Sequence, residues 1–154
     1  MLSPQSHGSG SAGSGYHTPV LAGEVVGFLR DKSTILDGTL GGGAHTRLLL
    51  EQGATVIALD RDPEAIAGAS ERLREYEQSG RFVPILGNFA GIDEIEATRH
   101  ARFDGILLDL GVSSHQLDEL ERGFSFREGA PLDMRMGSDA SLDAAELLAR
   151  ADER

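Results

Sequence analysis

Short apolar runs alternate with amphipathic stretches through most of this chain. Each apolar run is three to eight residues long and ends at an acidic, polar or glycine residue, which is typical of buried strands entering turns. Strands that alternate with helices at this spacing predict right-handed crossovers and an α/β fold with a doubly wound parallel sheet, with helices on both faces. The expected strands are residues 34–36, 55–59, 82–86 and 103–110.

Helical spacing of apolar residues and helix-capping residues predict the connecting helices. Thr18 and Pro19 suit the start of an entry helix, and Asp62 and Pro63 suit the start of another. Ser141 is the expected cap of a last helix. Two further helices are expected at residues 44–52 and 92–98. The apolar stripes of the three capped helices are, in chain order, Leu21, Val25, Phe28 and Leu29; Ile66, Ala69, Leu73 and Tyr76; and Leu142, Ala145, Leu148 and Ala149.

The fourth run differs from the others because it contains the unbroken apolar sequence Ile106-Leu107-Leu108. Such a run predicts a strand that is covered on both faces. The stretch that follows, from Gly111 to about residue 140, is predicted to be loop and functional surface rather than core.

Composition limits the class of protein. With 154 residues, the chain is one domain's worth of polypeptide. It has no cysteine, which excludes disulfides and thiolate zinc sites, and no second histidine lies near His45, so we expect no metal. Residues 1–15, mostly Ser and Gly, are expected to form a flexible tail. Neither a membrane span nor a secretory signal is apparent, so we expect a cytoplasmic chain without membrane partners.

Charge argues against extended contact with nucleic acid. Lys and Arg number 14 against 25 Asp and Glu, for a formal net charge of -11, so the surface as a whole repels phosphate. The only locally basic and aromatic piece is residues 122–135, where Arg122, Arg127 and Arg135 alternate with Phe124 and Phe126. This piece suits RNA backbone pairing and base stacking, and it equally suits an ordinary solvated loop.

Candidate chemistry lies at the strand ends, because ligands of open parallel sheets bind beyond the carboxyl ends of the strands. Asp37 and four glycines, at 38, 41, 42 and 43, follow the first strand, and Asp60 follows the second. Phe89 follows the third strand and Asp109 the fourth. Glycines admit a ligand close to the backbone, and an acidic residue after the second strand suits a ribose diol, so the pattern predicts an adenosine-type pocket.

The glycine turn distinguishes among adenosine ligands. The dinucleotide pattern G-x-G-x-x-G lacks its third glycine here, where Thr46 stands, and no lysine completes a phosphate loop. Asp37 would repel phosphate but could pair with an ammonium, which favours S-adenosylmethionine over NAD.

Each candidate site residue, taken singly, also has an ordinary structural explanation. Asp60 could be a helix cap, Phe89 a core residue and His45 a first-turn helix residue.

Several longer motifs resemble one family. They are YHTPVL at 16–21, DGTLGGGAHT at 37–46, ALDRDP at 58–63, DGILLDLGVSS at 104–114, RGFSF at 122–126 and PLDMRM at 131–136. Together they resemble the RsmH (MraW) family of bacterial methyltransferases. The resemblance implies a Rossmann-like class I methyltransferase fold, S-adenosyl-L-methionine as cofactor, and methylation of the exocyclic N4 amine of one cytidine in 16S ribosomal RNA of the small ribosomal subunit.

The resemblance also implies site residues. The family's cofactor contacts fall on Gly43, Ala44, His45, Asp60, Phe89, Asp109 and Gln116. Asp109 is also the candidate catalytic residue, because amino-methylating enzymes hold the target amine near this position. Among these, Gln116 comes from the resemblance alone. His115 stands where relatives often have Pro.

The resemblance covers about residues 16–150 and only the front half of the family, so the sheet is expected to be incomplete. After the tail expected at 1–15, it implies a cofactor-binding domain at 16–117 and a loop with the start of an inserted helical region at 118–154. An open apolar edge beside 103–110 predicts marginal solubility, self-association or a further partner. Two alternatives remain: a cofactor-binding module without turnover, and an NAD-dependent oxidoreductase.

Overall fold

The computed structural model describes residues 19–152 and contains one parallel sheet in the order β3-β2-β1-β4. Its strands are β1 (Thr34–Asp37), β2 (Thr55–Asp60), β3 (Phe82–Leu86) and β4 (Gly105–Leu107). All three strand pairs are parallel. The strands β2 and β3 lie on one side of β1 and β4 lies on the other side, which creates a topological switch point between β1 and β4. The predicted doubly wound parallel sheet is therefore confirmed.

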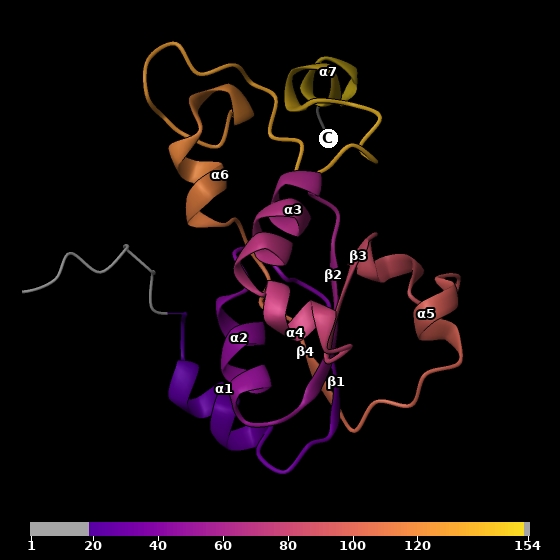
Figure 1. Cartoon of the computed structure of the whole chain (residues 1–154). Helices are drawn as coiled ribbons and strands as arrows, with labels where there is room; N and C mark the ends of the chain where they lie inside the picture. The colour runs from indigo at the N-terminus through magenta and orange to yellow at the C-terminus, as the bar shows by residue number, and fades with distance from the viewer. Residues whose placement is uncertain (1–18, 153–154) are drawn as a thin grey trace, which may run out of the picture.

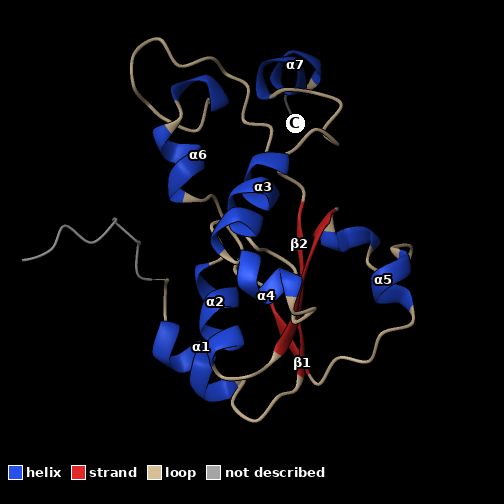
Figure 2. Cartoon of the chain, in the orientation of Figure 1, coloured by secondary structure: helices blue, strands red, loops and turns tan. Residues whose placement is uncertain are grey.

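Helices lie on both faces of the sheet. In Figure 1, α2, α3 and α4 lie on one face and α5 lies on the other, while α6 and α7 lie beyond the carboxyl ends of the strands. Figure 2 shows that much of the chain after β4 is loop. The helices are α1 (Ala22–Phe28), α2 (Ala44–Glu51), α3 (Pro63–Arg72), α4 (Arg74–Gln78), α5 (Glu96–Arg99), α6 (Ser114–Asp118) and α7 (Ala144–Arg150), with 3-10 turns η1 (Phe89–Gly91) and η2 (Leu120–Arg122).

The main core lies between the sheet and α2, α3 and α4. Alternate residues of β1 and β2 point into it, as the two-residue period of a strand requires. The buried members are Ile35, Leu40, Leu49, Leu50, Ala54, Val56, Ala58, Ala69, Leu73 and Phe82. Ile66 and Tyr76 pack against this cluster, so the apolar stripe predicted from the sequence is confirmed.

The helix that carries this stripe is broken at one residue. Leu73, at φ -109 and ψ 21, ends α3 and precedes α4, so the predicted single helix is two helices. The start of α3 agrees with the sequence: the Asp62 side chain accepts the amide hydrogen of Glu64 at 3.0 Å, and Pro63 takes the first helical position.

The prediction for β4 is wrong in two respects. The strand spans three residues instead of eight, and the side chain of Ile106 is 61% exposed instead of buried. Ile106 aligns with Leu36 of β1, so the two side chains share a face of the sheet. The four-residue α5, the helix on that face, is too short to cover β4, which pairs only with β1 among the described residues.

Three predicted helices also differ. α1 begins at Ala22, with Leu21 and Phe28 exposed, and the proposed cap Thr18 lies outside the described residues. The helix expected at 92–98 is instead η1 followed by the short α5. α7 is capped by Asp143 rather than Ser141, because Asp143 and Glu146 form a reciprocal capping box. The tail expected at 1–15 lies outside the described residues.

Candidate functional site

The loops that follow the four strands are joined by hydrogen bonds at the carboxyl edge of the sheet. Asp60 Oδ2 accepts the Gly41 amide hydrogen at 2.7 Å, which links the end of β2 to the glycine turn after β1. The amide of Asp109, after β4, donates to Thr39 Oγ1 at 2.7 Å. The amide of Gly87, after β3, donates to the Asp60 carbonyl at 2.8 Å. The strand ends that the sequence singled out therefore form one connected edge.

Asp37 is buried, and both of its carboxylate oxygens accept hydrogen bonds within the chain. One oxygen accepts from the Thr39 amide at 3.0 Å and the other from Thr46 Oγ1 at 2.7 Å, and the side chain is 1% exposed. Burial raises the pKa of Asp37, opposed by those hydrogen bonds and by the charge of His45. This geometry contradicts the direct pairing of Asp37 with a ligand ammonium that the sequence suggested. Asp37 instead fixes the turn between β1 and α2.

Asp60 holds two loops but keeps capacity for a ligand. Its second oxygen, Oδ1, accepts the Asp62 amide at 2.9 Å, so each carboxylate oxygen carries one internal hydrogen bond. A carboxylate offers about four acceptor positions, which leaves two for an outside donor. Asp60 is half-buried rather than enclosed. Asp62 caps α3, so the ordinary explanation of Asp60 as a helix cap does not hold.

Gly43 and Ala44 belong to the junction between the glycine turn and α2. Gly43 has φ 77, and a Cβ there would lie 3.3 Å from both Ala69 Cβ and Leu73 Cδ1, so the position requires glycine. Ala44 begins α2 directly after it. Gly43 is therefore needed for the packing of α2 against α3, whatever it does for a ligand.

His45 bridges two distant segments. Its Nε2 lies 2.9 Å from the Val20 carbonyl oxygen, which can only accept, so this nitrogen carries the proton. Its Nδ1 lies 3.6 Å from Asp109 Oδ2. The His45 side chain is 10% exposed and that of Asp109 is 50% exposed. Asp109 therefore presents its carboxylate to solvent at the mouth of the switch point.

Phe89 lies at the same edge, at the start of η1. A Cβ at Gly38 would be 3.3 Å from Phe89 Cβ and would collide with the Leu108 side chain, so Gly38 allows the turn after β1 to lie against Phe89 and Leu108. Phe89 is 40% exposed and Leu108 is 47% exposed. Together they give the edge an apolar surface beside the polar groups of Asp60 and Asp109.

Gln116 has a structural role in this structure. Its side-chain oxygen accepts from the Ser113 amide at 3.0 Å, and its own amide donates to Ser113 Oγ at 3.2 Å, which forms the capping box of α6. α6 reaches the start of α3 through His115, whose Nε2 is 3.3 Å from Glu64 Oε2. Ser113 is thus the N-cap of α6, and within residues 19–152 the hydrogen bonds of Gln116 do not connect it to the other predicted contacts.

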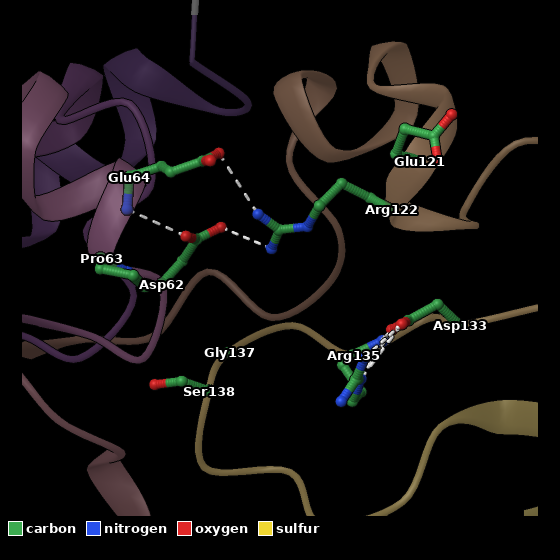
Figure 3. Close-up of a pocket in the computed structure, with 9 residues that line it drawn as sticks. All are labelled: Asp62, Pro63, Glu64, Glu121, Arg122, Asp133, Arg135, Gly137 and Ser138. Carbon is green, nitrogen blue, oxygen red and sulfur yellow. Dashed lines mark hydrogen bonds and ion pairs between the residues drawn. The ribbon is translucent and has the colours of Figure 1, made fainter. Parts of the chain in front are cut away.

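Arg122 packs the segment after α6 onto the start of α3, as Figure 3 shows. Its Nη2 is 2.7 Å from Asp62 Oδ2 and 3.1 Å from the Met136 carbonyl oxygen, and its Nη1 is 3.4 Å from Glu64 Oε2. The hydrogen bond to Asp62, opposed by desolvation, raises the pKa of Arg122. A cavity of about 340 Å³ lies between these elements, lined by Asp62, Pro63, Glu64, Glu121, Arg122, Asp133, Arg135, Gly137 and Ser138.

The arginines of residues 122–135 are not equally available to a nucleic acid. Arg122 is committed to Asp62, and Arg135 forms a two-pronged ion pair with Asp133, with its Nη2 2.6 Å from Oδ2. Arg127 contacts Asp118 at 3.9 Å with both side chains largely exposed, and Phe126 is completely exposed. Arg122 and Arg135 are therefore held by carboxylates of this chain, whereas Phe126 and Arg127 remain accessible.

Two residues that hold the site were not found from the sequence. Thr39 connects the buried Asp37 with the amide of Asp109, and Arg72 Nε donates to the Gly42 carbonyl at 3.1 Å. Thr39 lies inside the glycine motif, so its position was a usable signal. Arg72 is 30 residues away from Gly42 on an exposed helix face, where an arginine is ordinary in sequence.

No helix among residues 19–152 is long and apolar enough to cross a membrane.

Comparison with known proteins now identifies the family. The model of the MraW methylase family matches residues 14–154. The chain belongs to the MraW methylase family. Its sequence is 57% identical over 153 residues to the ribosomal RNA small subunit methyltransferase H of Gemmatimonas aurantiaca, covering 99% of this chain and 48% of that relative.

A second relative and a solved structure also match this chain. The protein of the same name from Anaeromyxobacter dehalogenans is 52% identical over 141 residues, covering 90% of this chain and 44% of the relative. A solved rRNA methylase from Streptococcus thermophilus aligns with a TM-score of 0.39 at 27% identity, over 47% of this chain and 43% of that one. The chain thus spans less than half the length of the curated MraW relatives it matches.

Proposed function

We propose that this chain binds S-adenosyl-L-methionine at the carboxyl edge of its sheet. In this proposal it supplies the cofactor-binding half of an enzyme that methylates the exocyclic N4 amine of a cytidine in 16S ribosomal RNA. The small-subunit ribosomal RNA follows the names of the relatives, and the cytidine amine follows the family resemblance of the sequence motifs. Such a substrate places the reaction on the small ribosomal subunit, in the cytoplasm.

The observation that carries the proposal is the linkage of strand-end loops around Asp60 and Thr39. Asp60 contacts the glycine turn, and Thr39 contacts the backbone of Asp109 across the switch point. Ligands of open α/β sheets bind at this point because the loops on either side diverge. Acidic, glycine-rich and aromatic positions are thereby brought to one edge.

The residues present fit a sulfonium-bearing nucleoside. Gly41, at φ 50, and Gly42, which has no neighbouring atom within 4 Å of the place a Cβ would occupy, leave space beside the turn. Asp60 has unused acceptor capacity for ribose hydroxyls, and the exposed Phe89 offers a surface for adenine. Thr46, where a dinucleotide site has its third glycine, is fully buried and bonded to Asp37, which argues against NAD.

The transfer itself needs alignment and one proton acceptor. The amine nitrogen forms a bond to the methyl carbon as the carbon–sulfur bond breaks, and the nitrogen then releases one proton, leaving S-adenosylhomocysteine. Because the lone pair of the amine is delocalised into the ring, alignment contributes most of the acceleration. In this proposal Asp109 orients the amine and accepts its proton, since its carboxylate is half-exposed at the mouth of the site.

RNA contact in this proposal is local. Phe126 is available to stack on a base and Arg127 to pair with phosphate, since both are exposed on the loop after α6. The net charge of -11 opposes broader contact, so this chain alone should bind RNA weakly.

The uncovered face of β4 supports a further partner proposal. Ile106, Leu108 and Leu110 are 61%, 47% and 69% exposed in and just after an edge strand, which favours self-association through this edge. Light scattering of the isolated chain and of Ile106→Lys tests the proposal. We expect the wild-type chain to form larger species that the variant lacks, and a monomeric wild-type chain at high concentration would refute it.

Transfer of labelled methyl from S-adenosylmethionine to small subunits that lack the modification tests the enzyme proposal. Label on the RNA, lost in Asp109→Ala, supports it. Because the chain spans less than half of its relatives, a cofactor-binding module without turnover is the second candidate. Binding of the cofactor without any transfer, alongside transfer by a full-length relative, would favour that module.

A further inference from the structure

A short segment far along the chain lies against two of the strand-end loops. Gly137 packs against the backbone of Arg61, in the loop after β2, so closely that a Cβ at Gly137 would collide with the Arg61 carbonyl. The position therefore requires glycine for a close approach between segments 76 residues apart. The contact brings the chain after α6 to the loop that carries Asp60.

Asp139, two residues further on, binds both loops with one carboxylate. Its Oδ1 accepts from Arg61 Nε at 2.9 Å and from Arg61 Nη2 at 2.8 Å. Its Oδ2 accepts from Asn88 Nδ2, in the loop after β3, at 3.2 Å. Partial burial acts to raise the pKa of Asp139, but the hydrogen bonds from Arg61 and Asn88 and the charge of Arg61 outweigh it, so the pKa is lowered. The carboxylate is therefore the form that these contacts stabilise.

The two partners of Asp139 adjoin the proposed nucleoside contacts. Arg61 directly follows Asp60, the proposed ribose acceptor. Asn88 directly precedes Phe89 and caps η1 by accepting the Ala90 amide at 3.0 Å. One side chain from residue 139 thus joins the loop of the ribose acceptor to the loop of the proposed adenine surface.

We propose that Asp139 is a positioning residue for the nucleoside part of the site, holding the loops of Asp60 and Phe89 at a fixed separation. This inference rests on the proposed function, because it concerns the same site. A site whose loops are already fixed loses less conformational entropy when a ligand binds. Removal of Asp139 should therefore weaken nucleoside binding, although the residue is not one of the proposed nucleoside contacts.

Calorimetric titration with S-adenosylhomocysteine tests the binding part of the proposal. We expect Asp139→Ala to raise Kd about fivefold, because a 43% exposed carboxylate makes modest ion pairs. Asp139→Glu, which keeps the charge, should restore much of the affinity. Asp118→Ala is the matched control, since the Asp118 side chain is 70% exposed and its ion pair with Arg127 is 3.9 Å long. Wild-type affinity in Asp139→Ala would overturn the proposal.

Amide hydrogen exchange on the ligand-free chain separates this proposal from the proposed function. The amides of Asp62 and Ala90 report the two loops, because they donate to Asp60 and Asn88 side chains at 2.9 and 3.0 Å. The buried amide of Val56, which donates to the Arg81 carbonyl at 2.8 Å, reports the core. We expect Asp139→Ala to speed exchange at Asp62 and Ala90 and to leave Val56 unchanged.

Equal acceleration at all three amides, or none at the loops, would overturn the positioning role. A wild-type chain that fails to bind S-adenosylhomocysteine would refute the proposed function instead, and the exchange result would still decide whether Asp139 joins the loops.

Discussion

Asp60 Oδ2 accepts the amide hydrogen of Gly41 at 2.7 Å, and so ties the end of β2 to the glycine turn after β1. The same carboxylate accepts the Asp62 amide through Oδ1 at 2.9 Å. The residue that the sequence assigned to ligand binding therefore also fixes the shape of the site before any ligand arrives.

Asp60→Asn is expected to lose one of these internal hydrogen bonds, because an amide has one acceptor oxygen. We expect the free energy of unfolding to fall by about 1–3 kcal/mol and the affinity for S-adenosylmethionine to fall about 10- to 100-fold. Urea unfolding and calorimetric titration measure the two effects. Asp118→Asn, at an exposed site, is the control, and wild-type affinity in Asp60→Asn would contradict the assigned role.

Gly43→Ala compared with Gly42→Ala tests the packing of the glycine turn. Gly43 has φ 77 and close neighbours in α3 and at Leu73, whereas Gly42 has no positive φ and nothing within 4 Å. We expect Gly43→Ala to lower the free energy of unfolding by about 1–3 kcal/mol and Gly42→Ala to change it by less than about 0.5 kcal/mol. Equal losses in denaturant unfolding would be inconsistent with this geometry.

Asp37 gives a pH-dependent prediction. Burial raises its pKa above the ordinary value of 3.8, so the folded state binds this proton more tightly than the unfolded state does. Its contribution to stability is complete below pH 3.8 and is lost as pH rises through the folded pKa. Asn at this position can still accept from Thr39 and contact Thr46 without burying a charge.

We therefore expect Asp37→Asn to gain stability relative to wild type as pH rises above 3.8 and through the folded-state pKa of Asp37. Urea unfolding at several pH values measures the difference. A difference that stays constant with pH would show that Asp37 has the same pKa in both states, contrary to its burial.

Arg122 and Arg127 are expected to have separate roles. Arg122→Met leaves the 4% exposed Asp62 side chain without its cation, so we expect a loss of about 1–3 kcal/mol in unfolding free energy. Arg127→Ala should change stability by less than about 0.5 kcal/mol but weaken binding of a ribosomal RNA fragment. Thermal unfolding and filter binding distinguish them. A destabilised Arg127→Ala with unchanged RNA affinity would reverse the assignment.

The sequence predicted those parts of the fold that local pattern controls. β3 begins and ends at the predicted residues, and β1, β2 and α2 differ by one residue or less at each end. The break at Leu73 and the exposure of Ile106 could not be predicted in this way. The exposure of Ile106 depends on which helix covers which part of the sheet, and the apolar run at 106–108 is compatible with either outcome. No Gly or Pro marks the break at Leu73 in the sequence.

The site was predictable as far as topology controls it. Parallel strands bring their carboxyl ends to one edge, which is why Asp60, Phe89 and Asp109 could be named from their positions after strands. The burial of Asp37 was not predictable, because it depends on a hydrogen bond from Thr46 in the first turn of α2. The ion pairs of Arg122 with Asp62 and of Arg61 with Asp139 join residues 60 and 78 positions apart, and no local pattern marks such pairs.

The most direct test of the account is a pair of calorimetric titrations of the purified chain, one with S-adenosylmethionine and one with NAD. The account predicts saturable binding of S-adenosylmethionine with one site per chain and no binding of NAD. Binding of NAD without binding of S-adenosylmethionine would contradict it.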